Sequence, residues 1–221
     1  MRQTYENNKR RIQTFKLTAD VKDDNGVVHH FFEGYEYVEI GGLKWATCNV
    51  GAEKETDGGL YFAWGETVGY KDVNEKHFTW EDYKFGKYCN LLKYNNNDGL
   101  DTLEACDDAA TKNMGRNWRT PTYDEYRTLL FATTNKCIRV NGVNGWLFTD
   151  KTDESKELFF PTIGHCYNGS VNNAGFYGYY WSSSSSTLNL IIGWVLFFGN
   201  RNCFMGCCDR YFGFPIRGVA K

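Results

Sequence analysis

The C-terminal part of the chain lacks several residue types that are frequent in the rest of it. Between Ser182 and Arg217 there is no Lys, Glu, Gln, Ala or His. Large apolar residues stand in their place, together with Cys203, Cys207 and Cys208. Either this stretch is a buried sheet core, or its side chains were selected by a process different from the one that shaped the rest.

The chain also lacks a strong net charge, a long apolar run and a signal peptide. Its formal net charge is −2 and its largest basic cluster is residues 9–11, so nothing indicates a nucleic-acid partner. No apolar run approaches the roughly 20 residues of a membrane span. The first residues, MRQTYENNKRR, are too polar for a signal peptide. Either the protein is not exported by that route, or a leader has been removed.

The eight cysteines lack the spacings of a metal site. They stand at positions 48, 89, 106, 137, 166, 203, 207 and 208, with no Cys-x-x-Cys pair and no histidine at zinc-finger distance. Without a leader, mostly free and buried thiols are favoured over a disulfide framework. We therefore expect no metal and no cofactor.

What the chain does contain indicates a folded α+β domain. Its 221 residues can bury a substantial core, and 17% of them are aromatic, which is typical of a globular protein. Apolar residues recur at helical spacing over residues 102–114, and Gly115 is placed to end that helix. A second helix is predicted from Thr122, with Glu125 completing a capping box.

Short strands and turns are predicted from Leu130 to the end of the chain, and two early helices followed by many strands define the α+β class. The predicted strands include residues 145–148 and 158–161, and the predicted turns lie at 141–142, 144–145 and 168–169.

Residues 1–36 are predicted to form a separate extension. Phe15, Leu17, Ala19 and Val21 alternate with polar residues, which predicts a strand. A turn at residues 23–26 and a second strand over 27–32 would complete a hairpin. This hairpin would lie against the main domain, residues 37–221, or serve as a subunit-contacting arm, which leaves homo-oligomerisation open. His29 and His30 would point to opposite faces of a strand and so could not share a metal.

Six motifs give the main domain a family resemblance. They are residues 37–52 (YVEIGGLKWATCNVGA), 59–66 (GLYFAWGE), 107–110 (DDAA), 117–122 (NWRTPT), 159–164 (FFPTIG) and 178–184 (GYYWSSS). Together they resemble the major-paralogous-domain family abundant in gut Bacteroidetes, whose members look like C-type-lectin-fold modules. The resemblance implies a C-type-lectin-like fold with two helices and several short antiparallel strands. It also implies that residues 37–40 pair with residues 215–219.

The C-terminal part resembles the variable region of diversity-generating-retroelement proteins, here about residues 180–217. The resemblance rests on the run that begins at Trp181, on Trp194, Leu196, Phe198, Met205 and Arg210, and on residues 213–218 (GFPIRG). In such systems a reverse transcriptase rewrites adenines of a template, mostly in AAC and AAT codons. These codons cannot become Lys, Glu, Gln, Met or Trp, so Trp194 and Met205 would be fixed scaffold positions.

The resemblance implies a ligand-binding surface made of the positions that such codons can fill. These positions are Ser186, Leu188, Leu190, Ile191, Ile192, Val195, Phe197, Arg201, Cys203, Phe204, Gly206, Cys207, Cys208, Asp209, Tyr211, Phe212 and Phe214.

Alternation along residues 194–198 supports the division into scaffold and display positions. In a strand, Trp194, Leu196 and Phe198 share one face, whereas Val195 and Phe197 point to the other. We expect the first three side chains in the core and the other two at the surface. An exposed patch of apolar side chains usually marks an interaction site.

Competing chemistries are less well supported. Formylglycine-generating enzymes share a related fold and use C-terminal cysteines, but no acid, base or histidine accompanies Cys203, Cys207 and Cys208 in their stretch. Calcium-dependent sugar binding needs a proline between carboxylate and amide ligands, and none of the three prolines fits. Residues 95–99 are predicted to be a polar turn rather than a calcium loop. Asp107 and Asp108 are predicted to cap a helix or to lie in solvent on it, rather than to form a catalytic pair.

These observations predict a non-enzymatic binding protein with a hypervariable surface on a constant scaffold. Its expected partner is a protein or glycan on a cell or phage surface. The protein would act on a phage virion in receptor binding, or at a bacterial cell surface as an adhesin. The alternative is a carbohydrate- or peptide-binding module of the same family with fixed specificity, and an oxidase resembling formylglycine-generating enzymes ranks third.

Overall fold

The predicted α+β class is confirmed by a computed structural model that describes residues 2–71, 74–88, 90–199 and 201–221. The structure is 14% helical and 41% strand. Its helices are α1 (Arg2–Phe15), the 3-10 turn η1 (Ala105–Asp107), α2 (Ala109–Met114) and α3 (Tyr123–Ala132). Among the described residues, no helix is both long and apolar enough to cross a membrane.

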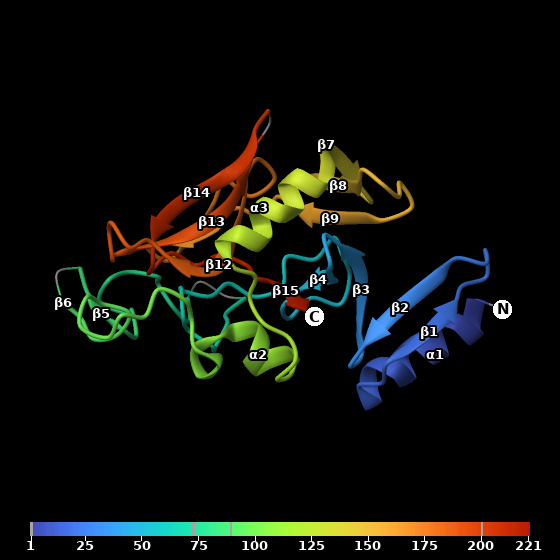
Figure 1. The fold of residues 1–221 in the computed structure, drawn as a ribbon, viewed down its shortest axis with the longest axis horizontal. Helices are drawn as coiled ribbons and strands as arrows, with labels where there is room; N and C mark the ends of the chain where they lie inside the picture. The colour runs from blue at the N-terminus through green and yellow to red at the C-terminus, as the bar shows by residue number, and fades with distance from the viewer. Residues whose placement is uncertain (1, 72–73, 89, 200) are drawn as a thin grey trace.

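The strands form five separate sheets (Figure 1). The first contains β1 (Ala19–Lys22), β2 (Val28–Phe32), β3 (Tyr35–Ile40), β4 (Leu43–Asn49) and β15 (Arg217–Ala220). Two small hairpins pair β5 (Gly86–Lys87) with β6 (Asn90–Leu91) and β10 (His165–Tyr167) with β11 (Ser170–Asn172). The remaining sheets contain β7 (Thr133–Val140), β8 (Val143–Asp150) and β9 (Glu157–Pro161), and β12 (Gly178–Ser185), β13 (Ile192–Phe198) and β14 (Cys203–Asp209).

The C-terminal strand closes the first sheet on β4. Arg217 lies opposite Asn49 and Val219 opposite Trp45. The expected pairing of residues 37–40 with residues 215–219 is therefore wrong by one strand. Gly41 and Gly42, both with positive φ, turn β3 tightly back onto β4, so β4 lies between β3 and β15.

The N-terminal hairpin is confirmed, but the residues before it differ from expectation. The Asp23 carboxylate accepts hydrogen bonds from the amides of Asn25 (2.8 Å) and Val27 (2.9 Å), which fixes the turn between β1 and β2. The predicted strand is wrong before Ala19, because Phe15 ends α1. The helix was not predicted because Ile12 is its only described buried residue, too weak an apolar pattern to detect. β2 pairs with β3, so the hairpin continues the sheet of the main domain.

The two predicted helices exist, although the first is shorter than expected. The Thr122 hydroxyl accepts a hydrogen bond from the Glu125 amide (3.2 Å) and the Glu125 carboxylate accepts one from the Thr122 amide (2.8 Å), which confirms the capping box. The helix expected over residues 102–114 is interrupted at Asp108, whose backbone is extended. Its carboxylate accepts a hydrogen bond from the Thr111 amide (2.9 Å), so the predicted capping role of Asp108 is confirmed. Gly115 ends α2 as predicted.

The C-terminal half consists of hairpins, as predicted. Turns at residues 141–142 and 168–169 join β7 to β8 and β10 to β11, and β8 and β9 contain the two predicted strands. The turn predicted at residues 144–145 is wrong, because both residues lie within β8. Gly145 is needed there for packing, since a Cβ atom would lie 2.3 Å from the Phe159 ring.

The sheet of β12, β13 and β14 lies between two hydrophobic clusters. Leu196 and Phe198 belong to one cluster, together with Tyr126 and Leu129 of α3, and Val195 belongs to the other. In Figure 1 this sheet and the N-terminal α1–β1–β2 unit lie at opposite ends of the molecule. The predicted variable region is therefore remote from the extension.

Candidate ligand-binding surface

The predicted variable region forms the β13–β14 hairpin and the two loops that flank it. β13 pairs with both β12 and β14, so it is the central strand of the sheet. The pairing of β13 with β14 runs without a break from Ile192 opposite Asp209 to Phe198 opposite Cys203. The hairpin therefore holds its side chains in a regular alternation between two faces.

One half of the predicted division between faces agrees with the structure. Leu196 and Phe198 are fully buried, as expected of scaffold positions. Trp194, which we also expected in the core, is only half-buried, and its ring packs 4.7 Å from that of Tyr123 on α3. α3 therefore covers this face of the hairpin.

The other half of the division is wrong for Val195. Its side chain is only 1% exposed and packs in the second hydrophobic cluster, whereas Phe197 on the same face is half-buried. Alternation predicts that residues 195 and 197 share a face, but not that this face is open to solvent. The sheet is covered on both sides here, so Val195 cannot contribute to a surface.

The prediction is also wrong for two further residues of the predicted surface, which are buried like Val195. Phe214 is 1% exposed, and its ring stacks on that of Tyr179 with 5.1 Å between centroids. Ser186 is 5% exposed, and its hydroxyl accepts hydrogen bonds from the amides of Leu188 and Asn189, both at 3.2 Å. Both residues therefore hold neighbouring segments in place rather than contribute to the surface.

The other predicted surface residues are exposed or half-buried. They are Leu188, Leu190, Ile191, Ile192, Phe197, Arg201, Cys203, Phe204, Gly206, Cys207, Cys208, Asp209, Tyr211 and Phe212. Leu188 is 98% exposed and Phe204 is 46% exposed, which is unusual for large apolar side chains. These fourteen positions form what we call the display surface.

Aromatic rings from outside the variable region extend the display surface. Tyr177 stacks on Phe197 (5.7 Å between centroids), and Phe197 contacts Phe204 (5.1 Å). On another part of the surface, Tyr167 contacts Phe212 at 5.0 Å. Sequence reasoning did not include Tyr167 and Tyr177. The sequence signal that could have identified them is an aromatic residue next to the turn residues of a loop.

A groove of about 520 Å³ separates the display surface from the β5–β6 hairpin. Leu188, Asn189, Leu190 and Ile191 form one wall. The opposite wall contains Tyr88, Asn90, Leu91, Asn95, Asn96 and Asn97. None of these side chains is charged, so the groove suits an uncharged ligand group.

Arg210 anchors the loop behind the groove. It is fully buried, donates a hydrogen bond from Nη1 to the Tyr94 carbonyl (2.9 Å), and lies over the Trp64 ring at 4.4 Å. Burial lowers the pKa of this guanidinium from its ordinary value. Replacing Arg210 would leave a cavity and lose these contacts, which fits a scaffold position rather than a display position.

The cysteines of the variable region do not converge on one site. Cys203 and Cys207 lie on the same face of β14, four residues or roughly 13 Å apart, and Cys208 lies on the other face. Burial raises the pKa of Cys203 and of Cys208 to about 12, so both are protonated thiols at neutral pH. A protonated thiol is a poor nucleophile and a poor metal ligand. The seven described cysteines are all free.

Two acidic groups, the loop at residues 95–99 that was weighed as a calcium loop and a group around Asp107, are already partnered by the protein itself. The Asp98 carboxylate accepts hydrogen bonds from the amides of Tyr94 (2.5 Å), Asn95 (3.1 Å) and Leu100 (3.0 Å), which confirms the predicted polar turn. Potential ligand atoms of Glu104, Cys106 and Asp107 lie within 4.8 Å of one another. The ammonium groups of Lys84 and Lys93 lie 2.8 Å and 2.6 Å from Asp107 and neutralise this group.

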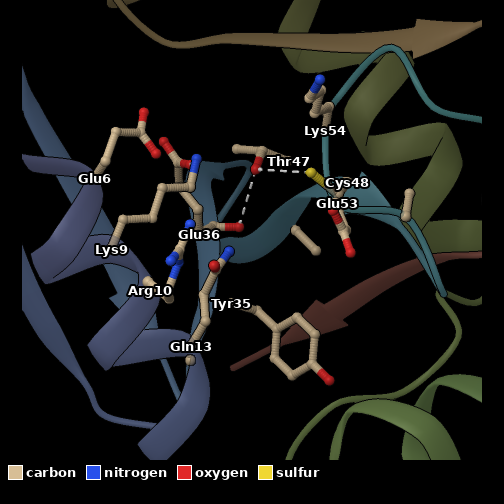
Figure 2. Close-up of a pocket in the computed structure, with 13 residues that line it drawn as sticks. Glu6, Lys9, Arg10, Gln13, Tyr35, Glu36, Thr47, Cys48, Glu53 and Lys54 are labelled. Atoms are coloured by element: carbon tan, nitrogen blue, oxygen red, sulfur yellow. Dashed lines mark hydrogen bonds and ion pairs between the residues drawn. The ribbon is translucent and has the colours of Figure 1, made fainter. Parts of the chain in front are cut away.

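A larger cavity, of about 690 Å³, lies between α1 and the first sheet (Figure 2). Lys9 and Glu36 form an ion pair of 3.3 Å in its wall, and Thr47 and Cys48 of β4 face it (Figure 2). Burial raises the pKa of the Cys48 thiol, so this thiol is not an activated nucleophile. None of the predicted surface residues lines this cavity.

Comparison of the chain with protein-family models, curated proteins and solved structures finds no match.

Proposed function

We propose that the protein is a non-enzymatic ligand-binding protein whose display surface is diversified by a retroelement. The proposal includes a constant C-type-lectin-like scaffold, as the sequence motifs imply. One observation carries it: the stretch without Lys, Glu, Gln, Ala and His, between Ser182 and Arg217, contains the β13–β14 hairpin and its flanking loops, where fourteen predicted variable residues are exposed or half-buried. A buried core would explain the absence of Lys and Glu but not the exposure of Leu188 and Phe204.

The division between exposed and buried positions supports the proposal. Fourteen of the predicted variable residues are exposed or half-buried, whereas the scaffold residues Leu196, Phe198 and Arg210 are fully buried. Variation is tolerated only where a side chain contributes little to folding. Val195, Ser186 and Phe214 would then vary little, or only among residues of similar volume.

Binding would depend on a few large side chains of the display surface. Each aromatic or aliphatic anchor contributes roughly 1.5–3 kcal/mol if a partner buries it completely. In this variant the candidate anchors are Ile191, Ile192, Phe197, Phe204, Tyr211 and Phe212. By family resemblance, the ligand would be a protein or glycan on a cell or phage surface, and the protein would act in phage receptor binding or bacterial adhesion.

Sequencing of the surrounding genome tests this function. We expect a near-repeat of the coding region for residues 180–217 beside a reverse-transcriptase gene, differing from the gene only where the repeat has adenine. Without such a repeat, the proposal fails and a binding module of fixed specificity takes its place. Stoichiometric copper binding that Cys203→Ser abolishes would instead support an oxidase.

A further inference from the structure

Strand β14 presents an open backbone edge. It pairs with β13 on one side and, among the strands of the described residues, with none on the other. In the described part of the chain, no further hydrogen bond is made by the backbone of Cys203, Met205 or Cys207. β14 therefore ends the sheet with a row of unpaired donors and acceptors.

The phase of the β13–β14 ladder identifies which residues point outward. The amide of Gly199 donates to the carbonyl of Asn202 (3.0 Å) at one end, and the amide of Arg210 donates to the carbonyl of Ile191 (2.9 Å) at the other. Backbone groups in an antiparallel strand alternate between its two neighbours. Residues 204, 206 and 208 therefore bond to β13, and residues 203, 205 and 207 direct their N–H and C=O groups outward.

The opposite edge of the same sheet is covered. On β12, the amides of Ser183 and Ser185 donate to the carbonyls of Pro121 (2.8 Å) and Asp101 (2.7 Å). The Ser183 carbonyl accepts a hydrogen bond from the amide of Leu103 at 2.9 Å. The open edge of the sheet is therefore confined to the variable hairpin.

β14 also lacks most of the features that normally protect an edge strand. It is seven residues long, contains no Lys, Arg or Pro, has Asp209 at its end as its one charged residue, and pairs with β13 without a bulge. By contrast, the edge strand β7 carries Lys136 and Arg139, and β9 ends in Pro161. Part of each face of β14 is open, because Phe204 is exposed on one face and Cys207 on the other, where α3 packs over the rest of the hairpin.

We infer that the edge of β14 binds an extended segment of a protein ligand, which adds as a further strand. This inference rests on the proposed function, in which six of the seven residues of β14 vary and only Met205 is constant. Apart from the Met205 side chain, the backbone is then the one feature of β14 that every variant shares. Its hydrogen bonds would supply affinity independent of sequence, and the neighbouring variable side chains would supply specificity.

The alternation of the outward groups selects the chemistry of the ligand. Only another extended main chain presents acceptors and donors at the spacing of a strand, so a glycan does not fit this edge. Pairing with β14 of a second copy would use the same edge and cover the variable side chains beside it, so these side chains could not contact a ligand. A segment of a foreign protein leaves the varying positions free to provide specificity.

Selection from a library of random 12-residue peptides on the full chain tests the inference. Cys207→Ala, which loses the display side chain but keeps the outward N–H, is the matched control against which binding of the selected peptides to Cys207→Pro is compared. Cys207→Pro removes that N–H and places a ring at the edge, so binding should weaken about tenfold or more. Thermal unfolding of both variants checks that the fold is kept.

An N-methyl scan of one selected peptide needs no protein variant. Methylation of every second residue should weaken binding about tenfold, and methylation of the intervening residues should change it less than about threefold. This period of two is specific to strand addition. A scan without it, or a library that yields no binding peptide, overturns the inference.

Two further results separate this inference from the proposed function. A dimer in light scattering that Cys207→Pro dissociates would assign the edge to a second copy and overturn the inference. A peptide bound with period two, in a genome without the template repeat, would keep the edge site and reject diversification. A template repeat together with peptides that bind Cys207→Pro normally would keep diversification and reject the edge site.

Discussion

Replacing Phe198 and Phe204 separately by alanine tests the assignment of scaffold and display positions with one chemical change. Both residues lie in the β13–β14 hairpin, but Phe198 is fully buried and Phe204 is 46% exposed. The Phe198 ring lies 5.7 Å from that of Tyr180 and 6.1 Å from that of Trp146. The Phe204 ring contacts only Phe197 among the ring pairs of the described residues.

The expected losses of stability differ severalfold. Phe198→Ala empties a core site and should lower the free energy of unfolding by about 3–5 kcal/mol. Phe204→Ala removes a side chain that is about half in solvent, so the loss should be about 1 kcal/mol, including its contact with Phe197. Urea unfolding followed by circular dichroism measures both values, and equal slopes for all three proteins would validate the comparison.

Two outcomes would contradict this assignment. A loss below about 1.5 kcal/mol for Phe198→Ala would mean that the face packed against α3 is not core. A loss for Phe204→Ala as large as that for Phe198→Ala would mean that the display surface carries the fold.

Three further predictions concern other parts of the same surface and its support. Val195→Ser should cost about 2–3 kcal/mol because it buries a hydroxyl in the core, whereas Leu188→Ser should change the unfolding free energy by less than about 0.5 kcal/mol in the same urea assay. Burial tends to raise the pKa of Glu125, but hydrogen bonds from Arg119 and Thr122 outweigh it and hold the pKa below the ordinary 4.5. Glu125 therefore stabilises the protein above that pH and loses this effect as the pH falls through the lowered pKa. When unfolding is measured between about pH 6 and 3, the free energy of unfolding of Glu125→Gln should fall less than that of the unmodified protein. Burial raises the pKa of Cys166, Cys203 and Cys208 to about 12. Brief alkylation at pH 8 followed by mass spectrometry should therefore label the exposed Cys106, Cys137 and Cys207 first. Rapid labelling of Cys208 would contradict its burial.

Local signals in the sequence predicted local structure well. The capping box of Thr122 and Glu125, the hairpin at Asp23 and the glycine turns all depend on residues a few positions apart. Helix α1 escaped detection because it packs through little more than Ile12. The position of β15 beside β4 depends on contacts between residues far apart in the chain, which no local pattern encodes.

For the candidate surface, the sequence predicted which side chains of a strand share a face but not which face is exposed. The period of two separated Val195 from Leu196, but it could not indicate that hydrophobic clusters cover both faces at this point. Ser186 and Phe214 were misplaced for a related reason, since burial of a loop residue depends on which distant segments pack over it. The open edge of β14 required knowledge of the strand order, because every strand has two edges until its neighbours are known.

The position of Arg217 has a consequence for protein synthesis. Its buried guanidinium donates hydrogen bonds to Asn49 (3.0 Å), to the backbone carbonyls of Ala46 (3.0 Å) and Thr47, and to that of Phe159 (3.0 Å). The main domain therefore cannot close until the ribosome has passed the whole of the predicted variable region, residues 180–217. A chain that terminates early within that stretch lacks Arg217 and β15, leaves the edge of β4 open, and should be degraded. Closure of the main domain thus depends on Arg217, because its side chain joins β4 to β9.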